Sequence, residues 1–464
     1  MHNNCRNTLQ EGEEIMCGYL VYKTEKKLKE KTIKKLKDSL SHRGIHISVH
    51  NEPGELVIHN MLPMTSMVES EYKQPLLNPY KWKGFIGAFS GEIFNWEELK
   101  EKYHLDSKND SELFTDIMLG PNASPKVHEM DGFWNFAAIH NKKLIGIVDY
   151  LSQKPLYYRT DLEALCSEPY PLTLLAPVTK DKIFFSSIPK FGYDTEGNTP
   201  WEEIKQIPIG SYYEGGEINK YWDWDLVEDI PLRTGISKSV KARMGGKREP
   251  AILLSGGLDS AIIYHYAKKI NPDIEVFHIE NRENKYVKLL TDKYEKINLE
   301  DYTISREEAI RRNQTPVDLG SVIPQAQLAE ALKSKGIHVV LSGDGSDELF
   351  SGYDRNLHYD SQHSDIFQEL PYYHNPRLDR IMMGSVVELR APFMASYIVK
   401  YALSLDFEAR RYKKVLKYLY KNVLPTAIIM RDKLALKSEQ IKKKKQRDNT
   451  IENIAIFNKL FNLK

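Results

Sequence analysis

The sequence has 464 residues, which is too long for one ordinary hydrophobic core, so two domains are expected. Its 65 basic and 64 acidic residues leave a formal charge of +1, which gives no reason to expect nucleic acid or an anionic membrane as the main partner. Three cysteines (Cys5, Cys17 and Cys166) argue against a disulfide framework, and no apolar run is long enough to cross a bilayer, so we expect a soluble cytoplasmic protein.

The amino-terminal half predicts a layered α+β domain. Met1–Met16 are polar and lack apolar periodicity, so the fold is expected to begin at Cys17 and to extend to about Tyr221. After a first strand from Cys17, strands are expected at Leu56–His59, Phe85–Phe89, Phe136–His140, Leu144–Val148 and Lys182–Ser186, with helices at Glu25–Ser39 and Trp96–Tyr103. Short strands interleaved with helices are typical of this fold class.

The carboxyl-terminal half follows a different pattern. A loop-prone segment, Trp222–Arg248, contains the expected boundary and one helix at Ile236–Met244. Buried strands are then expected at Ala251–Leu254, Ile274–His278 and Val339–Leu341, with helices at Ser260–Ile270 and Ala326–Ser334. This alternation predicts an α/β doubly wound parallel sheet, whose ligands bind beyond the carboxyl ends of its strands. The chain from Ile398 to Leu424 predicts helices, and Lys437–Arg447 is a charge run typical of a solvated helix face or a tail.

A glycine-rich stretch, Leu253–Ser260, follows the first of these buried strands. Glycines let backbone N–H groups converge on an anion, and the start of the next helix adds unpaired donors. The stretch therefore predicts a phosphate-binding loop, although a plain strand-to-helix turn has the same residues. It is not a Walker loop, because no Gly-Lys-Ser/Thr follows the glycines.

A second stretch of small residues and carboxylates, Ser342–Tyr353, follows another buried strand. It lacks the spacing of an EF-hand loop. Together the two stretches resemble the ATP-pyrophosphatase domain of the glutamine-dependent asparagine synthetase family. The resemblance continues, in the same order along the chain, through Asp318–Gln325, Val387–Phe393, Leu424–Pro425 and Arg431–Lys433.

The amino-terminal half also resembles this family, through motifs of its glutaminase domain. These are Cys17–Gly18, His42–Gly44, Gln74–Leu76, Gly91–Asn95, Asp110–Glu112, Asp131–Gly132 and Lys154–Tyr158. The resemblance implies an α+β N-terminal-nucleophile sandwich followed by an α/β doubly wound ATP-pyrophosphatase domain with a helical carboxyl-terminal part. We expect residues 1–16 to be a leader or a mis-assigned start, residues 17–221 the glutaminase domain, residues 222–440 the ATP-pyrophosphatase domain, and residues 441–464 a charged tail.

For the second domain, the resemblance implies ATP and Mg²⁺ as cofactors and an acyl-adenylate as intermediate. The implied ATP-binding residues are Leu254, Ser255, Gly256, Gly257, Asp259, Ser260, Ile279, Ser342 and Gly343, and the implied Mg²⁺ ligands are Asp259 and Asp347. Glu388 and Lys433 match a catalytic pair near the adenylate, where a carboxylate takes a proton from the attacking amine and an ammonium stabilises negative charge. A salt bridge between Glu388 and Arg390, and a surface position for Lys433, are the structural alternatives.

For the first domain, the resemblance implies a nucleophilic Cys17 whose own α-amino group acts as base. The implied glutamine-binding residues are Ser90, Gly91, Glu92 and Asp110, of which Asp110 holds the substrate amine. A free amine at Cys17 requires that residues 1–16 be removed or never translated. The codons for Glu11–Glu14 are purine-rich and would resemble a bacterial ribosome-binding site upstream of Met16. This favours translation that starts at Met16. The alternative is that Cys17 is a buried structural residue.

Two departures from the family pattern concern glutamine use. By position, the arginine that binds the glutamine carboxylate is replaced by Met61, and the asparagine of the oxyanion hole by Ser90. A methionine cannot form a charge-assisted bond with a carboxylate, and loss of one oxyanion donor costs about 10²- to 10³-fold in rate. Ammonia-dependent synthesis or a repurposed domain therefore stays open.

The resulting interpretation is an amide ligase that converts aspartate, ATP and glutamine or ammonia into asparagine, AMP and pyrophosphate. Ammonia freed at Cys17 would pass through the protein to the adenylate near Glu388. One alternative is a relative that activates another carboxylate, as β-lactam synthetases and lasso-peptide cyclases do; another is a catalytically silent binding protein. The expected partners are small molecules, and a homodimer stays open.

Overall fold

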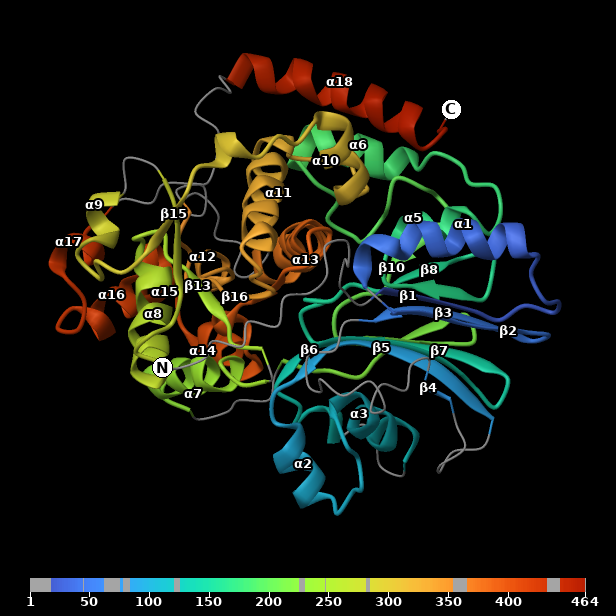
Figure 1. Ribbon diagram of the computed structural model, residues 1–464, viewed down its shortest axis with the longest axis horizontal. Helices are drawn as coiled ribbons and strands as arrows, with labels where there is room; N and C mark the ends of the chain where they lie inside the picture. The colour runs from blue at the N-terminus through green and yellow to red at the C-terminus, as the bar shows by residue number, and fades with distance from the viewer. Residues whose placement is uncertain are drawn as a thin grey trace, which may run out of the picture.

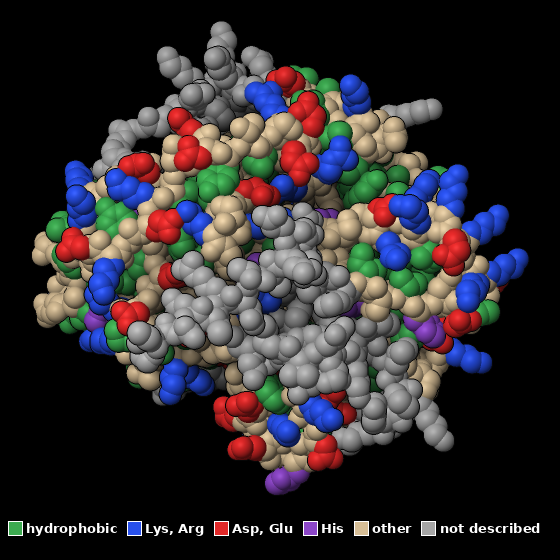
Figure 2. All heavy atoms as spheres, viewed as in Figure 1, with side chains coloured by type: hydrophobic (Ala, Val, Ile, Leu, Met, Phe, Trp, Pro, Cys, Tyr) green, Lys and Arg blue, Asp and Glu red, His purple; other side chains and the backbone are tan. Residues whose placement is uncertain are grey.

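The structure is a computed structural model, and it describes residues 18–44, 46–61, 76–77, 84–120, 126–224, 230–246, 248–280, 284–353, 365–431 and 443–463. Two halves lie side by side, each with its own sheets and helices (Figure 1). Acidic and basic side chains are interspersed over the face drawn in Figure 2, in keeping with the formal charge of +1. In the described part of the chain, none of the helices has both the length and the apolar character that a membrane crossing needs.

The first half is a sandwich of two antiparallel sheets. One sheet has the order β10-β8-β9-β1-β3-β2 and the other the order β12-β11-β7-β6-β5-β4. The strands of the first sheet are β1 (Gly18–Tyr22), β2 (His46–Glu52), β3 (Glu55–Met61), β8 (Tyr157–Arg159), β9 (Ala164–Cys166) and β10 (Ile204–Gln206). Those of the second are β4 (Leu76–Leu77), β5 (Phe85–Ile93), β6 (Gly132–His140), β7 (Lys143–Val148), β11 (Ser211–Glu214) and β12 (Glu217–Lys220).

Helices cover both outer faces of this sandwich. Helices α1 (Glu30–Leu40) and α5 (Pro169–Thr173) lie on the first sheet, and α2 (Trp96–Lys102) and α3 (Asp110–Leu119) lie on the second (Figure 1). Side chains such as Tyr19, Val57 and Ala137, all fully buried, fill the space between the sheets. The four layers confirm the predicted α+β sandwich.

One predicted strand is wrong. Residues Lys182–Ser186 belong to helix α6 (Lys182–Phe191). The Asp181 side chain caps this helix by accepting a hydrogen bond from the backbone N–H of Phe184 at 2.8 Å, and Gly192 ends it in the left-handed conformation with φ +86°. Phe184 and Ile188, one helical turn apart, are both buried. Ile183, in the same run, is 59% exposed, so only one face of this capped helix is buried.

The second half is a parallel sheet with helices on both faces, as predicted. Its order is β15-β14-β13-β16-β17, with bounds β13 (Ala251–Leu253), β14 (Val276–Ile279), β15 (Glu295–Ile297), β16 (Val339–Leu341) and β17 (Glu388–Arg390). Helices α7 (Leu232–Arg243) and α8 (Leu258–Ile270) share one core with Ile252 and Leu341, and α11 (Leu319–Ser334) and α13 (Asn375–Met383) share another with Ala251 and Val340. The shorter helices before residue 390 are α9 (Asn284–Val287), α10 (Arg306–Asn313) and α12 (Ser346–Leu349).

The carboxyl-terminal part is helical, again as predicted. It contains α14 (Ser396–Ser404), α15 (Phe407–Arg410), α16 (Lys414–Tyr420), α17 (Thr426–Ile429) and α18 (Lys443–Leu460). Where we expected a charged tail, the described residues include α18, which lies across α10 and the neighbouring α6 (Figure 1). Phe457 is fully buried, and its ring centroid lies 5.6 Å from that of Trp201 in the first half. The helix therefore packs against both halves.

Buried charges join the two halves. The Arg43 guanidinium, which belongs to the first half, pairs with Glu168 at 2.7 Å and with Asp379 of α13 at 2.9 Å. The ammonium of Lys154 pairs with the same Asp379 carboxylate at 2.9 Å. All four side chains are nearly inaccessible to solvent.

The packing of α18 can be tested with Phe457→Ala. Loss of a fully buried phenylalanine should lower the free energy of unfolding by about 3 to 5 kcal/mol. Thermal unfolding of the full chain measures the effect, and amide hydrogen exchange should show faster exchange in α18. Ile451→Ala is the matched control, because Ile451 lies on the same helix and is 67% exposed. If Phe457→Ala and Ile451→Ala lowered the free energy of unfolding by the same small amount, the packing of α18 against the two halves would be contradicted.

Candidate active site at the carboxyl edge of the parallel sheet

The first glycine-rich loop joins β13 to α8. Gly256 has the left-handed φ of +74°, and a Cβ on it would lie 2.9 Å from the Cβ of Tyr286, so only glycine fits. The Ser255 and Ser260 hydroxyl oxygens lie 3.0 Å apart, and the backbone N–H of Ser255 donates to the Ser260 hydroxyl at 3.2 Å. These bonds close the loop at the start of α8, where unpaired backbone donors favour an anion.

The second glycine-rich loop lies directly against the first. Strands β13 and β16 are parallel neighbours, with Ile252 opposite Leu341, so both loops leave the same edge of the sheet. A Cβ on Gly343 would lie 2.7 Å from the Cβ of Asp259, and the Ser346 hydroxyl donates to Asp259 Oδ1 at 2.7 Å. The structure thus brings together the two loops that the sequence singled out.

The two predicted metal ligands converge on one cation. Asp259 Oδ2 and Asp347 Oδ1 each lie 2.6 Å from the Nζ of Lys413. Burial raises the pKa of Asp259, the Lys413 ammonium lowers it, and the nearby Asp347 raises it again. Burial alone would lower the pKa of Lys413, but the two carboxylates outweigh it and hold that pKa above its ordinary value. No sequence motif distinguishes Lys413 from the many other lysines of the chain.

These two carboxylates suit Mg²⁺ that arrives with a nucleotide. Among the described residues, no group of three or more His, Cys, Asp or Glu side chains could hold a metal by itself. Mg²⁺ usually takes one or two protein carboxylates and completes its shell with phosphate oxygens and water. Asp259 and Asp347, which already converge on a positive charge, fit that role.

The other predicted nucleotide contacts lie at the same edge. Leu254 is bonded through its backbone N–H to Phe277 of β14, and Ile279 ends that strand. Arg431 reaches the first loop: its Nη1 donates to the Ser255 carbonyl at 3.3 Å, and its guanidinium lies over the Tyr286 ring at 4.7 Å. Lys433 itself lies outside the described residues.

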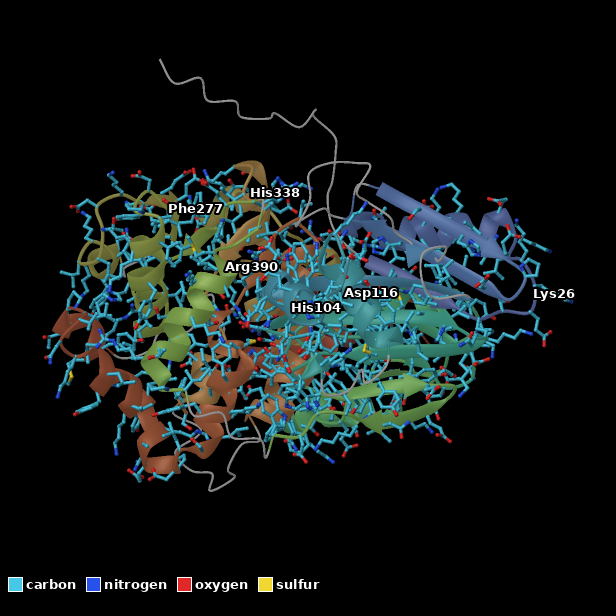
Figure 3. All side chains as sticks on the ribbon, turned by 90° about the horizontal axis from the view of Figure 1, so that it is seen from below. Lys26, His104, Asp116, Phe277, His338 and Arg390 are labelled. Atoms are coloured by element: carbon cyan, nitrogen blue, oxygen red, sulfur yellow. The ribbon has the colours of Figure 1, made fainter. Side chains whose placement is uncertain are left out.

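Glu388 lies farther from this edge. It pairs with Val339 at the start of two parallel strands, whereas the loops follow their ends. Its Oε1 accepts a hydrogen bond from Arg390 Nε at 2.8 Å, and Arg390 Nη2 lies 3.6 Å from Glu92 in the first half. Arg390 lies in the interior of the molecule (Figure 3). The salt bridge that the sequence left open is therefore present. Asp344, which the sequence reading did not single out, is a half-buried carboxylate within the second loop itself.

The predicted glutamine-binding residues lie on β5 and α3. Gly91 has φ +135°, and a Cβ there would lie 2.1 Å from the carbonyl oxygen of Phe133, so glycine is required. The adjacent Ser90 and Glu92 are buried. Asp110, at the start of α3, accepts hydrogen bonds from the backbone N–H groups of Ile93 at 3.2 Å and of Ser111 at 2.8 Å. The structure brings Glu92 and Asp110 into one buried site.

Several predictions for this half fall outside the described part of the chain. They concern Met1–Met16, Cys17, Gln74 and Pro75, together with the side chain of Met61.

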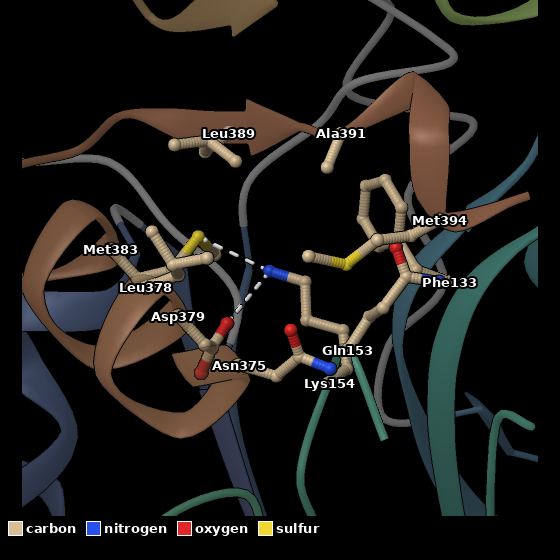
Figure 4. A pocket seen from close by; sticks show the side chains of 10 residues that line it. All are labelled: Phe133, Gln153, Lys154, Asn375, Leu378, Asp379, Met383, Leu389, Ala391 and Met394. Carbon is tan, nitrogen blue, oxygen red and sulfur yellow. Dashed lines mark hydrogen bonds and ion pairs between the residues drawn. The ribbon is translucent and has the colours of Figure 1, made fainter. Parts of the chain in front are cut away.

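A cavity lies between the two halves (Figure 4). Phe133, one of its lining residues, is the cross-strand partner of Glu92. The first half contributes Phe133, Gln153 and Lys154 to its lining, and the second contributes residues such as Leu378, Met383 and Leu389. The Lys154 ammonium lies at one side, paired with Asp379 and 3.2 Å from the Met383 sulfur. Leu389 lines the cavity from β17, whereas its strand neighbours Glu388 and Arg390 direct their side chains to the opposite face.

The fold and the site define a two-domain ligase of the amidotransferase class, in which an antiparallel sandwich is joined to a parallel-sheet domain with paired glycine-rich loops. The family model for the glutamine amidotransferase domain matches residues 16–222, and that for asparagine synthase matches residues 232–374 and 358–455. The chain belongs to the glutamine-dependent asparagine synthetase family.

The individual relatives have low sequence identity to this chain but match most of its length. The chain is 24% identical to the probable glutamine-hydrolysing asparagine synthetase of Acanthamoeba polyphaga mimivirus, over 86% of this chain and 80% of the relative. It is 24% identical to asparagine synthetase B of Escherichia coli, over 85% and 76% of the two chains, and 24% identical to the human asparagine synthetase, over 77% and 72%. Among solved structures, the Bacillus subtilis glutamine phosphoribosylpyrophosphate amidotransferase matches at 14% identity and a TM-score of 0.33, over 57% of this chain and 66% of that chain.

The buried Asp110 predicts a specific pH dependence of stability. Burial raises the pKa of Asp110 to about 7, although the hydrogen bonds from Ile93 and Ser111 lower it. The folded state then binds the Asp110 proton more tightly than the unfolded chain does. The contribution of Asp110 to the free energy of unfolding therefore falls as the pH rises from about 4 to about 7. Asp110→Asn lacks this loss, and its melting temperature relative to wild type should rise over that interval. Asp106→Asn, at an exposed position, should show no such trend; a parallel trend would contradict the assignment.

Proposed function

We propose that this protein is an ATP-dependent amide ligase that makes asparagine from aspartate, with glutamine or ammonia as nitrogen source. The observation that carries the proposal is the contact between the two glycine-rich loops, with Asp259 and Asp347 converging between them. One loop with an adjacent helix start can bind any phosphate. Two facing loops with paired carboxylates suit a nucleotide that is cleaved to pyrophosphate and transfers AMP.

In this proposal the first loop binds the leaving pyrophosphate. The contributing groups are the backbone after Leu254, Gly256 and Gly257, and the hydroxyls of Ser255 and Ser260. Ile279, Ser342 and Gly343 line the nucleotide at the neighbouring strand ends. A Mg²⁺ ion held by Asp259 and Asp347 would offset the negative charge that builds up on the phosphates. Lys433, two residues after Arg431 in the sequence, would stabilise the charge of the adenylate.

Two carboxylates are candidates for taking the proton from the attacking amine. Glu388 is the residue that the family pattern proposes, but its carboxylate is bonded to Arg390 and lies away from the loops. Asp344 lies in the second loop and is half-buried. We therefore propose Asp344 as the base and Glu388 as a positioning residue that fixes Arg390 between the halves.

Ammonia would reach this site through the interior of the protein. In the proposal, Cys17 releases it from glutamine beside Gly91, Glu92 and Asp110. The cavity between the halves lies on the way to β17, and its largely apolar lining suits neutral ammonia better than ammonium. The buried Ser90 in place of an amide donor favours a weak glutaminase, so added ammonium should be the better nitrogen source.

Pyrophosphate release over a panel of carboxylates tests the activity itself. Aspartate should support release, and ammonium chloride should support a faster rate than glutamine because an oxyanion donor is missing. Cys17→Ala should abolish only the glutamine reaction, while Asp347→Ala should abolish both. Release with another carboxylate, and none with aspartate, would favour an adenylating ligase of different specificity; no release with any carboxylate would favour a silent binding protein.

The roles of Asp344 and Glu388 separate in kinetics with ammonium. Asp344→Asn should lower kcat by about 10²- to 10⁴-fold, the usual contribution of a general base, without lowering the melting temperature. Glu388→Gln leaves Arg390 short of one buried partner, so it should lower the melting temperature and spare more of kcat. Steady-state rates and thermal unfolding measure both effects. The reverse pattern, with kcat lost only in Glu388→Gln, would restore Glu388 as the base.

A further inference from the structure

Lys413 is held in place by the loop whose carboxylate it contacts. Its backbone N–H donates to the Phe350 carbonyl at 3.1 Å, and that of Tyr412 donates to the Ser351 carbonyl at 3.0 Å. Both Tyr412 and Lys413 have left-handed φ angles, 53° and 58°, which are strained for non-glycine residues. This strained backbone conformation directs the Lys413 side chain toward Asp259 and Asp347.

The path of the side chain is equally constrained. A Cβ on Gly352 would lie 2.4 Å from Lys413 Cε and 2.0 Å from Asp347 Oδ1, so glycine at this position makes room for the ion pair. Lys413 is only 7% exposed. Its ammonium occupies the point on which Asp259 and Asp347 converge, and it therefore offsets the repulsion between these two partly buried carboxylates.

A divalent cation would use the same two carboxylate oxygens. Mg²⁺ binds carboxylate oxygens at about 2.0 to 2.1 Å, whereas the Lys413 nitrogen lies 2.6 Å from each of them. The two cations would repel each other at this distance, so both cannot hold these oxygens together. A lysine side chain is a flexible point charge, so its ammonium can move to a nearby phosphate while its backbone stays in place.

We propose that Lys413 is a displaceable internal cation that excludes divalent metal from Asp259 and Asp347 until the metal arrives with a nucleotide. The triphosphate then offers the displaced ammonium a new anionic partner, so metal and ATP bind together and free metal binds poorly. This inference rests on the proposed function for the nucleotide site. Lys413 is on this view a positioning residue that couples metal binding to nucleotide binding.

Binding of Mn²⁺ to the full-length, nucleotide-free protein tests the inference, with free Mn²⁺ measured by electron paramagnetic resonance. Wild type should bind weakly. Lys413→Met and Lys413→Gln, which remove the charge, should each bind at least about tenfold more tightly, and adding Asp347→Asn should reverse this gain. Lys413→Arg keeps the charge and should remain weak. Lys414→Met is the matched control, because Lys414 is an exposed neighbour paired with Glu408, and it should leave binding unchanged.

Lys413→Met and Lys413→Gln both remove the charge, and whichever of them folds is sufficient to test the proposal. Mn²⁺ affinity in Lys413→Gln or Lys413→Met that equals or falls below the wild-type value would overturn the proposal. So would tight binding by Lys413→Arg. Because Mn²⁺ binding requires no turnover, its result is separate from that of the pyrophosphate assay: a protein inactive with aspartate would refute asparagine synthesis and leave this inference standing.

Discussion

The arrangement of the two halves depends on a buried set of charges at their interface. Arg43 bonds Glu168 within the first half and Asp379 in the second, and Lys154 shares the Asp379 carboxylate. Buried ions require paired and well-directed partners, because each unpaired charge costs several kcal/mol. The interface therefore tolerates few relative positions of the halves. That constraint fixes the cavity beside Lys154 and the approach of Arg390 to Glu92.

Much of the second half could be predicted because its signals are local. A buried strand, glycines and a helix start within Leu253–Ser260 together specify a loop, and the same pattern at Ser342 specifies its neighbour. Parallel pairing of β13 and β16 then brings the two loops together without further information. The error at Lys182–Ser186 has a local cause as well: its run of three apolar residues fits a strand or a helix, and the cap at Asp181 decides it.

What sequence reasoning missed depends on contacts between distant segments. Lys413 lies 154 residues after Asp259, and no spacing rule connects them. Glu388 carries the expected motif, yet its position at the start of β17 and its bond to Arg390 follow from sheet register and from the other half. The sequence does not distinguish Asp344 from the other carboxylates of its acidic loop. Motifs predicted which segments form the site, but the role of each side chain within it required the packed fold.

Among the described residues, several pairs of carboxylates share one cation, and three of these pairs lie at the interface of the halves or at the candidate site. Arg43 joins Glu168 to Asp379, and Arg390 joins Glu388 to Glu92. Arginine suits such fixed links, because its planar guanidinium offers several donors in set directions. Lysine joins the third pair, Asp259 and Asp347, at the edge of the sheet that carries the proposed nucleotide site. An ammonium on a flexible stem can leave a carboxylate pair more easily than a guanidinium held at several points. At the interface, Lys154 also pairs with Asp379, but Arg43 holds the same carboxylate, so that link does not depend on the lysine alone. In our proposal, the lysine charge between Asp259 and Asp347 is the one that moves.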